Sequence, residues 1–252
     1  MPDNTYERPE LLAQYLNFHY GREEEVLPWH FGPRTALHFP VRCVTECLDA
    51  QRLPNGARAL DVGCAVGRST LELSRYCAEV VGIDFSHTFV MAASLLCREG
   101  SLPYDLPEVG GISRRVEAHL PEGIDCEGIS FRREDAQFLP SDLGQFDVVL
   151  AANLLCRLPN PQKFLDRLPG LMNPGGQLII TTPNTWLETF TAKDYWIGAT
   201  PETGEPLEAL KTVLAPSFTF ENSRDLPFLI REHARKFQWS VAQASMWTRR
   251  AD

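Results

Sequence analysis

The stretch Arg58-Ala59-Leu60-Asp61-Val62-Gly63-Cys64-Ala65-Val66-Gly67 decides the fold of this 252-residue chain. Its first half, Arg58 to Val62, has the short apolar pattern of a buried strand and ends at Gly63. Gly63 and Gly67 have no side chain, so the backbone between them can turn tightly and approach a ligand closely. In an open parallel sheet, ligands bind outside the carboxyl ends of the strands. The stretch therefore predicts the first strand of a parallel sheet and the ligand-binding loop that follows it.

Strand-like and helix-like segments alternate on both sides of this loop, which is typical of a parallel sheet covered by helices. Further strands are expected at residues 80–85, 129–132, 146–151 and 177–182, with helices at 69–77, 88–98 and 161–171. Two later strand-like segments, 218–221 and 239–247, predict an antiparallel hairpin at the sheet edge. The predicted fold is α/β, a Rossmann-like and mostly parallel sheet of seven strands with an antiparallel terminal hairpin.

The length of the chain suits one large domain, residues 1–252, with three parts. Residues 1–55 have helical patterns and are expected to form an N-terminal helical cap over the ligand side of the sheet. Residues 56–185 form the core, in which the turn-rich segment 100–128 predicts an inserted hairpin with a strand at 114–120. Residues 186–252 hold an aromatic, proline-rich segment and the closing strands.

Composition excludes several classes of protein. A net charge of −9 argues against a nucleic-acid partner, because binding to a phosphate backbone needs a concentrated positive face. No apolar run is long enough for a membrane span and residues 1–20 do not resemble a signal peptide, so a cytoplasmic location is expected. The seven cysteines have no spacing typical of a metal site, and we expect free thiols and no metal.

Three acidic residues that follow predicted strands indicate which ligand binds. Asp61 lies in the first loop, Asp84 ends the second strand 21 residues after Gly63, and Asp135 with Ala136 follows the third. A carboxylate at the second position can accept both hydroxyls of a ribose, and one at the third can bond an adenine amine. Asp61 would repel a pyrophosphate by about 1 kcal/mol or more, but it would attract an ammonium. S-adenosylmethionine has a ribose, an adenine, an ammonium and no phosphate.

At these positions the chain resembles the class I methyltransferases, whose first motif is Asp-x-Gly-x-x-x-Gly, over about residues 57–185. The resemblance implies that S-adenosyl-L-methionine is the cofactor and S-adenosyl-L-homocysteine the product. It also implies that residues 186–252 supply the acceptor side. The residues expected to bind the cofactor are Arg42, Asp61, Gly63, Cys64, Ala65, Gly67, Asp84, Phe85, Ser86, Asp135, Ala136, Asn153 and Leu154.

The flanking segments resemble a narrower family, the methyltransferase module of ovothiol biosynthesis. The similar segments are Tyr15 to Gly21, Phe39-Pro40 before Arg42-Cys43, the loop from Gly63 to Ser69, and Pro227 to His233. That family methylates a ring nitrogen of 5-thiohistidine, so the resemblance implies this small-molecule acceptor. The iron-dependent sulfoxide synthase half of the fused enzymes is absent from this sequence, and the synthase of the same pathway is a candidate partner.

Methyl transfer from a sulfonium to a ring nitrogen chiefly needs positioning and exclusion of water, so no single catalytic base is expected. The candidate catalytic residues are His19, Tyr20 and Asn153, and the candidate acceptor-binding residues are Tyr15, His19, Tyr20, Trp186, Trp196 and Arg231. Each has a plainer interpretation. His19 and Tyr20 can be packing residues, Arg231 a solvated charge, and Asn153 the cap of a turn.

Two other functions stay open at this point. The chain is either a methyltransferase for another small metabolite or a partner subunit that binds S-adenosylmethionine without turnover. The intact loop from Asp61 to Gly67 weakens the second alternative, because a degenerate subunit has no need of every cofactor contact.

Overall fold

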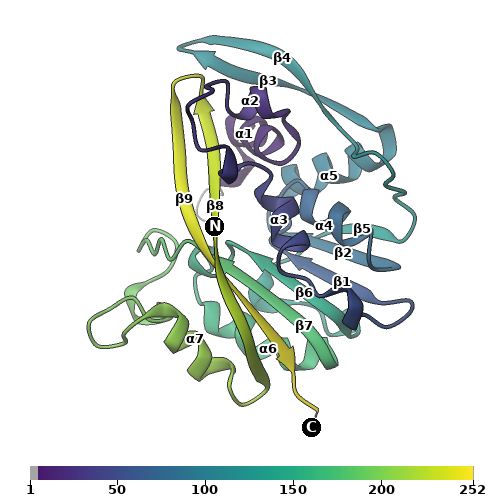
Figure 1. Cartoon of the computed structure of the whole chain (residues 1–252), viewed down its shortest axis with the longest axis vertical. Helices are drawn as coiled ribbons and strands as arrows, with labels where there is room; N and C mark the ends of the chain where they lie inside the picture. The colour runs from purple at the N-terminus through teal and green to yellow at the C-terminus, as the bar shows by residue number, and fades with distance from the viewer. Residues whose placement is uncertain (1–4, 252) are drawn as a thin grey trace.

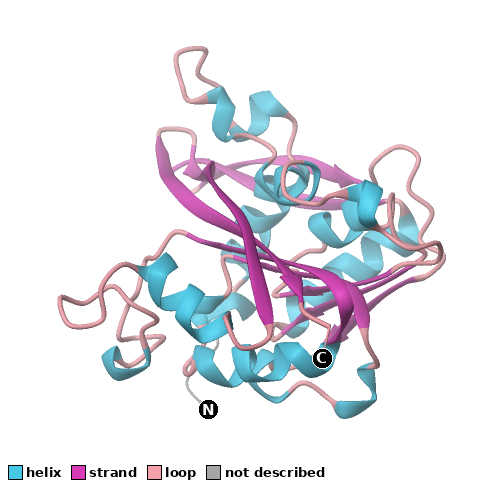
Figure 2. Cartoon of the chain, turned by 60° about the horizontal axis from the view of Figure 1, so that its bottom comes forward, coloured by secondary structure: helices cyan, strands magenta, loops and turns pink. Residues whose placement is uncertain are grey.

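The computed structural model describes residues 5–251, which form a central sheet of seven strands with helices on both of its sides (Figures 1 and 2). The strand order is β5-β2-β1-β6-β7-β9-β8. The first five are parallel, and β9 is antiparallel to both β7 and β8. The predicted mostly parallel sheet of seven strands with an antiparallel terminal hairpin is confirmed.

The strands of the sheet are β1 (Arg58–Val62), β2 (Glu79–Asp84), β5 (Ile129–Arg133), β6 (Phe146–Ala152), β7 (Met172–Thr182), β8 (Phe218–His233) and β9 (Lys236–Arg249). The helices are α1 (Pro9–Tyr20), α2 (Glu23–Val26), α3 (Phe39–Thr45), α4 (Arg68–Leu73), α5 (His87–Glu99), α6 (Pro161–Leu171) and α7 (Pro206–Leu214). A separate two-stranded sheet consists of β3 (Ser101–Val109) and β4 (Ile112–His119).

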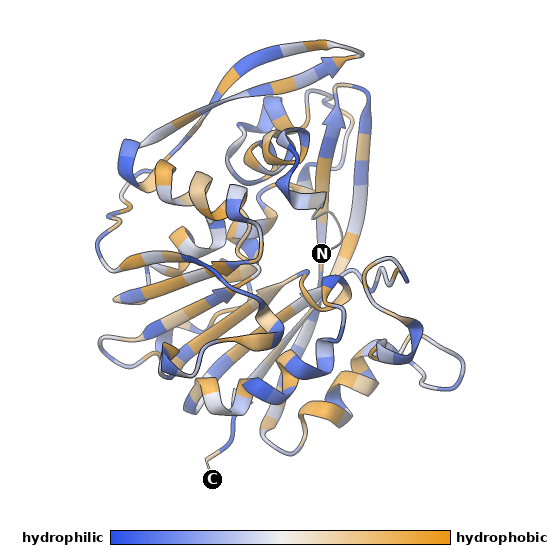
Figure 3. Ribbon diagram, turned by 180° about the vertical axis from the view of Figure 1, so that it is seen from behind, coloured by the Kyte–Doolittle hydropathy of each residue, from blue (hydrophilic) through white to orange (hydrophobic). Residues whose placement is uncertain are grey.

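Both faces of the parallel strands are buried, as expected when helices cover a sheet on two sides. In β1, Leu60 packs in a cluster with residues of α6 and α7, whereas its neighbour Ala59 packs in a cluster with residues of α3. Side chains that follow one another in a strand point to opposite faces, so continuous apolar runs mark such strands. Figure 3 shows hydrophobic residues concentrated in the sheet. Polar residues are therefore expected at the edge of the sheet where the parallel strands have their carboxyl ends.

Local sequence signals set the ends of the helices that border this edge. The Ser86 side chain accepts a hydrogen bond from the Phe89 N–H and so caps the N-terminus of α5, and Gly100, with a φ of 78°, follows the last residue of the helix as its C-cap. In α6, the Asn160 side chain caps the Gln162 N–H, and Pro161 takes the first helical position.

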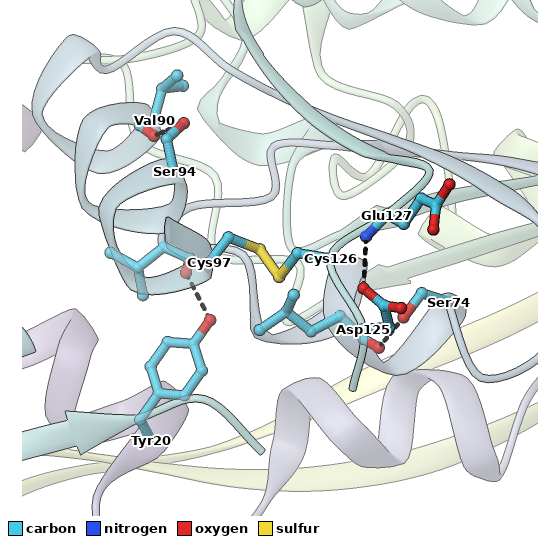
Figure 4. Close-up of a disulfide and its surroundings, with 10 residues drawn as sticks. Tyr20, Ser74, Val90, Ser94, Cys97, Asp125, Cys126 and Glu127 are labelled. Atoms are coloured by element: carbon cyan, nitrogen blue, oxygen red, sulfur yellow. Dashed lines mark hydrogen bonds between the residues drawn. A yellow bond between two sulfur atoms is a disulfide. The ribbon is translucent and has the colours of Figure 1, made fainter. Parts of the chain in front are cut away.

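The terminal hairpin is longer than the sequence indicated. The predicted strands 218–221 and 239–247 are only parts of β8 and β9, which extend beyond the sheet as a two-stranded arm (Figure 1). Helix α7 lies inside the proline-rich segment, where no helix was expected. The expectation of seven free thiols is wrong, because Cys97 of α5 and Cys126 before β5 form a disulfide (Figure 4). The other five cysteines are free and buried.

Candidate cofactor and acceptor site

The loop between β1 and α4 is held close to its neighbours. The N–H groups of Gly63 and Cys64 both donate to the Ile83 carbonyl of β2, at 2.7 and 3.0 Å. Gly67 has a φ of 87°, and a Cβ there would lie 2.7 Å from the Phe131 ring and 3.0 Å from Ala93. Only glycine fits this position, and its carbonyl accepts the first hydrogen bond of α4, from the Leu71 N–H at 2.9 Å. The loop is therefore packed tightly against β2, β5 and α5 at the edge of the sheet.

Asp61 is the buried carboxylate beneath this loop, with a side chain that is not exposed to solvent. Its Oδ2 accepts hydrogen bonds from the hydroxyls of Ser69 and Thr70, both at 2.7 Å, while its Oδ1 has no partner within the described chain. Burial raises the pKa of Asp61 to about 6, against the lowering effect of the two hydroxyls. An unpaired, buried acceptor atom fits a ligand that brings its own donor, such as an ammonium.

Asp84, at the end of β2, is half-buried and fixed by two backbone donors. Its Oδ2 accepts from the Ala65 N–H at 2.9 Å, and its Oδ1 accepts from the Ser86 N–H at 2.8 Å. Burial raises its pKa to about 6, and these backbone hydrogen bonds lower it. Each carboxylate oxygen has more than one acceptor site, so a fixed Asp84 can also accept two ligand hydroxyls.

Asp135 and Phe85 border the same edge at the end of β5 and β2. Asp135 Oδ1 accepts from the Gln137 N–H at 2.9 Å, which fixes the carboxylate, and Ala136 beside it is buried. The Phe85 ring is 45% exposed, with the Arg133 guanidinium 5.7 Å from its centroid. An exposed ring next to a fixed carboxylate is a suitable surface for a flat aromatic group such as adenine.

Asn153 and Leu154 follow β6 on the other side of the loop. Asn153 has a φ of 54°, and its Oδ1 accepts from the Thr181 hydroxyl at 3.0 Å. Leu154 covers Gly63, where an added Cβ would lie 3.0 Å from its Cδ1. The left-handed φ of Asn153 turns the chain across the end of the sheet. The carboxyl ends of the neighbouring strands β2, β1 and β6 border the same region.

Comparisons with known proteins agree with this geometry. Two family models, each described as a methyltransferase domain, match residues 60–180 and 122–242. The solved structure of a SAM-dependent methyltransferase from Methanosarcina mazei has a TM-score of 0.56 at 18% identity, covering 80% of this chain and 96% of that one. The chain is thus similar in sequence to methyltransferase domains over residues 60–242, and it has the fold of a class I, S-adenosylmethionine-dependent methyltransferase. Its cofactor is S-adenosylmethionine.

Two further similar proteins are an N-methyltransferase and an O-methyltransferase. The N-methyltransferase NodS from Bradyrhizobium japonicum WM9, solved with S-adenosyl-L-homocysteine, has a TM-score of 0.50 at 15% identity, covering 94% of this chain and 98% of that one. The ubiquinone biosynthesis O-methyltransferase of Coxiella burnetii is 25% identical over 177 residues, 68% of this chain. The match spans 64% of that relative's length.

The N-terminal segment lies across the cofactor edge of the methyltransferase domain. Glu7 accepts hydrogen bonds from the N–H groups of His87 and Thr88 at the start of α5, at 2.8 and 3.1 Å. The Tyr20 hydroxyl at the end of α1 donates to the Val66 carbonyl of the loop at 2.7 Å. Tyr20 is thus attached to the cofactor loop itself. No sequence pattern pointed to Glu7, which lies 80 and 81 residues from its two partners.

His19 and Tyr15 lie on the same helix, and their ring centroids are 5.9 Å apart. Burial lowers the pKa of His19 to about 3, and the nearby Arg68 lowers it further, so the imidazole is neutral at physiological pH. Its Nδ1 is buried and has no hydrogen-bond partner in the described part of the chain. Burial also raises the pKa of Tyr15, whose surroundings include Tyr6, Arg157 and Asp84.

Three other predicted site residues have partners of their own. The Arg42 guanidinium donates hydrogen bonds to the Glu46 carboxylate and to the carbonyls of Thr35 and Pro227. Arg42 therefore connects α3 to β8. Arg231 is not solvated: it is buried and paired with Glu108 at 2.7 Å, and it also donates to two backbone carbonyls. The Cys64 thiol is buried, and burial raises its pKa well above the ordinary value, so it is not a reactive thiolate.

Trp186 and Trp196, on the segment after β7, stack with ring centroids 6.2 Å apart. Trp186 Nε1 has no hydrogen-bond partner among residues 5–251, and the same is true of Asn184 Oδ1. Trp186 and Asn184 line a small pocket together with Thr182 and Gln243. Asn184 was not among the predicted site residues. Its position directly after a buried strand could have indicated a site residue. Asparagine also tolerates the left-handed φ of 52° found there.

Residues 5–251 contain no group of three or more His, Cys, Asp or Glu side chains close enough to hold a metal ion. Within the same range, none of the helices combines the length and the hydrophobicity that crossing a membrane requires.

Proposed function

We propose that this methyltransferase transfers the methyl group of S-adenosylmethionine to an imidazole ring nitrogen of 5-thiohistidine, which yields ovothiol. The observation that carries the proposal is the meeting of the segments that resemble the ovothiol family. Phe18 of α1, Phe39 of α3 and Phe228 of β8 pack together, with ring centroids 4.9 to 6.2 Å apart. These segments lie far apart in sequence and outside the core motifs, yet they form one body that holds α1 on the cofactor loop.

The electrostatics of His19 favour a nitrogen nucleophile. Bound S-adenosylmethionine supplies an electrophilic methyl group. A neutral imidazole has a free ring lone pair at neutral pH and needs no base to expose it, whereas a phenol with a pKa near 10 must lose its proton. His19, with a pKa of about 3, is too weak a base for that step. Its neutral ring and unpaired Nδ1 suit orienting an acceptor by a hydrogen bond instead.

On this proposal, Asn153, Trp186 and Trp196 lie on the acceptor side with Tyr15, His19 and Tyr20. Asp61, Asp84 and Asp135 bind the cofactor, and Tyr20 holds the loop through Val66. Arg231 is left out of the acceptor site, because its two terminal nitrogens already bond the Glu25 and Pro107 carbonyls and the Glu108 carboxylate. The acceptor would come from a sulfoxide synthase of the same pathway.

The second candidate function is O-methylation of a phenolic small molecule. It rests on the curated relatives, among them the ubiquinone biosynthesis O-methyltransferase of Coxiella burnetii. The third, a subunit that binds the cofactor without turnover, is weakened by the completeness of the contacts around Asp61 and Asp84.

The test is a mass-spectrometric assay of the purified chain with S-adenosylmethionine, in which 5-thiohistidine, histidine and a catechol are offered in parallel. The proposal expects one added methyl on 5-thiohistidine, located on a ring nitrogen by fragmentation. Methylation of the catechol alone would support the second function. Cofactor binding with no product from any acceptor would contradict the proposed acceptor and leave the cofactor site standing.

A further inference from the structure

The arm of β8 and β9 leaves one edge of β9 open. Strand β7 pairs with β9 only from Thr248 to Gln243, and its last pair is Thr182 with Gln243. From Ala242 to Phe237, β9 pairs with β8 alone. Figures 1 and 3 show this part of β9 from opposite sides, with no other strand beside its outer edge.

Two side-chain contacts reveal which β9 residues face outward. In an antiparallel ladder, residues whose N–H and C=O point toward the partner strand alternate with residues that point away. The Pro227 carbonyl accepts from Arg42 and the Arg231 carbonyl accepts from Gln14, so both point away from β9. Their opposite residues on β9, Val241 and Phe237, therefore also point away from β8, as does Trp239 between them.

The backbone groups of Phe237, Trp239 and Val241 thus have no partner within residues 5–251. The same three residues carry the apolar side chains of this edge: Trp239 is 57% exposed, Val241 is 41% exposed and Phe237 is half-buried. Phe237 and Trp239 line a groove with Trp29, Phe31 and Leu229. Soluble proteins usually protect an open edge with charge, proline or a covering element, and a long apolar edge is a site for strand pairing.

We infer that this edge pairs with the same edge of a second copy of the chain, in antiparallel orientation about a two-fold axis at Trp239. The segment Phe237-Gln238-Trp239-Ser240-Val241 has the same character read in either direction. Under this symmetry Trp239 lies opposite Trp239 of the second copy, Phe237 opposite Val241, and Gln238 opposite Ser240. Each outward residue exchanges two backbone hydrogen bonds with its opposite residue.

Charge and shape favour a second copy over an unrelated peptide. The first charged residue beyond this segment, Lys236, would oppose the small, uncharged Ala242, so no like charges meet across the interface. Residues directly opposite in a ladder point to the same face, so the apolar side chains of the second copy lie on the groove side. The interface is self-complementary, as a two-fold dimer requires.

Sedimentation velocity over a range of concentrations tests the inference. The wild-type chain is expected to sediment as a dimer at tens of micromolar, and Trp239→Lys is expected to raise the dimer dissociation constant by about tenfold or more. Ile112→Lys is the matched control, because Ile112 is a 64% exposed apolar residue on the other hairpin. Melting temperatures of both variants verify the fold. A wild-type monomer at all concentrations, or a dimer insensitive to Trp239→Lys, would overturn the inference.

A cross-linking experiment tests the register. In a hydrogen-bonded antiparallel pair the Cα atoms lie about 5.5 Å apart, within the range of a disulfide. Trp239→Cys is therefore expected to form a covalent dimer under mild oxidation. Gln238→Cys is not, since its opposite residue is Ser240. Cross-linking through position 238 and not through 239 would contradict the two-fold axis at Trp239.

Discussion

The Ala65 N–H donates to Asp84 Oδ2 at 2.9 Å, so the carboxylate that ends β2 holds the loop that follows β1. One side chain therefore has two tasks, because it fixes the loop and faces the position expected for the cofactor ribose. The Ser86 N–H fixes the other oxygen of the same carboxylate. Loop geometry and cofactor affinity should consequently change together when Asp84 is altered.

Asp84→Asn is expected to weaken S-adenosylmethionine binding by about 1 to 3 kcal/mol, about 5- to 150-fold, because charge-assisted hydrogen bonds are lost. Isothermal titration calorimetry measures the change. Asp105→Asn is the control, since the Asp105 side chain is 60% exposed and pairs with Arg115 of the hairpin. Unchanged affinity in Asp84→Asn would show that the cofactor lies elsewhere.

Cofactor affinity should depend on pH near 6. Burial holds the pKa of Asp61 and of Asp84 at about 6, and the ionised carboxylates attract the ammonium and accept the hydroxyls of the ligand. Affinity for S-adenosylmethionine is therefore expected to rise from pH 5 to pH 7 and then to level off. Calorimetry at four pH values measures this, and Asp61→Asn should flatten the curve. If the affinity of the variant changes with pH as much as that of the wild type, Asp61 is not the cause of the pH dependence.

Stability should change with pH in the opposite direction. The folded protein holds the protons of Asp61 and Asp84 more tightly than the unfolded chain, whose carboxyl pKa values lie near 4. The contribution of these groups to the free energy of unfolding is fully present below about pH 4 and is lost as pH rises through 6. Urea denaturation of wild type and Asp61→Asn at pH 5 and pH 7 isolates this term. The variant should lose less stability between the two pH values.

Gly67→Ala should destabilise the protein more than Gly175→Ala does. Both glycines have a φ above 80°, so both substitutions carry a strain of about 1 to 2 kcal/mol. A Cβ at Gly175 meets nothing within 4 Å, whereas at Gly67 it meets the Phe131 ring at 2.7 Å. Denaturation curves give the difference between the variants, and adding Phe131→Leu to Gly67→Ala should reduce it. Equal losses in the two variants would mean that the ring moves away freely.

Loss of the Cys97–Cys126 disulfide should lower the free energy of unfolding by about 2 to 4 kcal/mol, because the bond closes a loop between residues 29 apart. Denaturation with and without a thiol reductant measures this in the wild type. Cys126→Ser should show the same loss and no further response to the reductant. If reductant leaves the wild type unchanged, the two thiols are not bonded in solution.

His19→Gln should reduce kcat/KM for the acceptor by about tenfold or more while the affinity for S-adenosylmethionine stays within about twofold. The expectation rests on the proposed orienting role of the His19 ring. With a pKa of about 3, His19 should add no inflection to the pH profile of kcat between pH 5 and 8. An inflection that disappears in the variant would identify His19 as a base instead.

The parallel core could be predicted from sequence because its signals are local. The apolar runs of β1, β2 and β6 and the Gly63 to Gly67 loop need no knowledge of distant residues. The length of β8 could not be seen in the same way, since Pro227 and a polar run interrupt its pattern. Pro227 is tolerated because the ladder position it occupies faces away from β9 and needs no N–H.

The misjudged residues have partners that are distant in sequence. The plainer interpretation of Arg231 as a solvated charge is wrong, because Arg231 is buried and Glu108, 123 residues earlier on the inserted hairpin, pairs with it. Cys97 and Cys126 have no spacing that indicates a bond. Of the candidate site, the acidic residues follow from strand-end logic, whereas Asn184 and Glu7 depend on tertiary contacts that sequence patterns do not report.

The position of β9 has a consequence for synthesis of the protein. It is the last strand of the sheet to leave the ribosome, yet it lies between β7 and β8. Until it emerges, β7 has an open apolar edge and β8 has no partner in the sheet. The nascent chain must therefore hold an unfinished sheet until Arg249, the last residue of β9, has left the ribosome, a state in which exposed edges favour aggregation and engage chaperones.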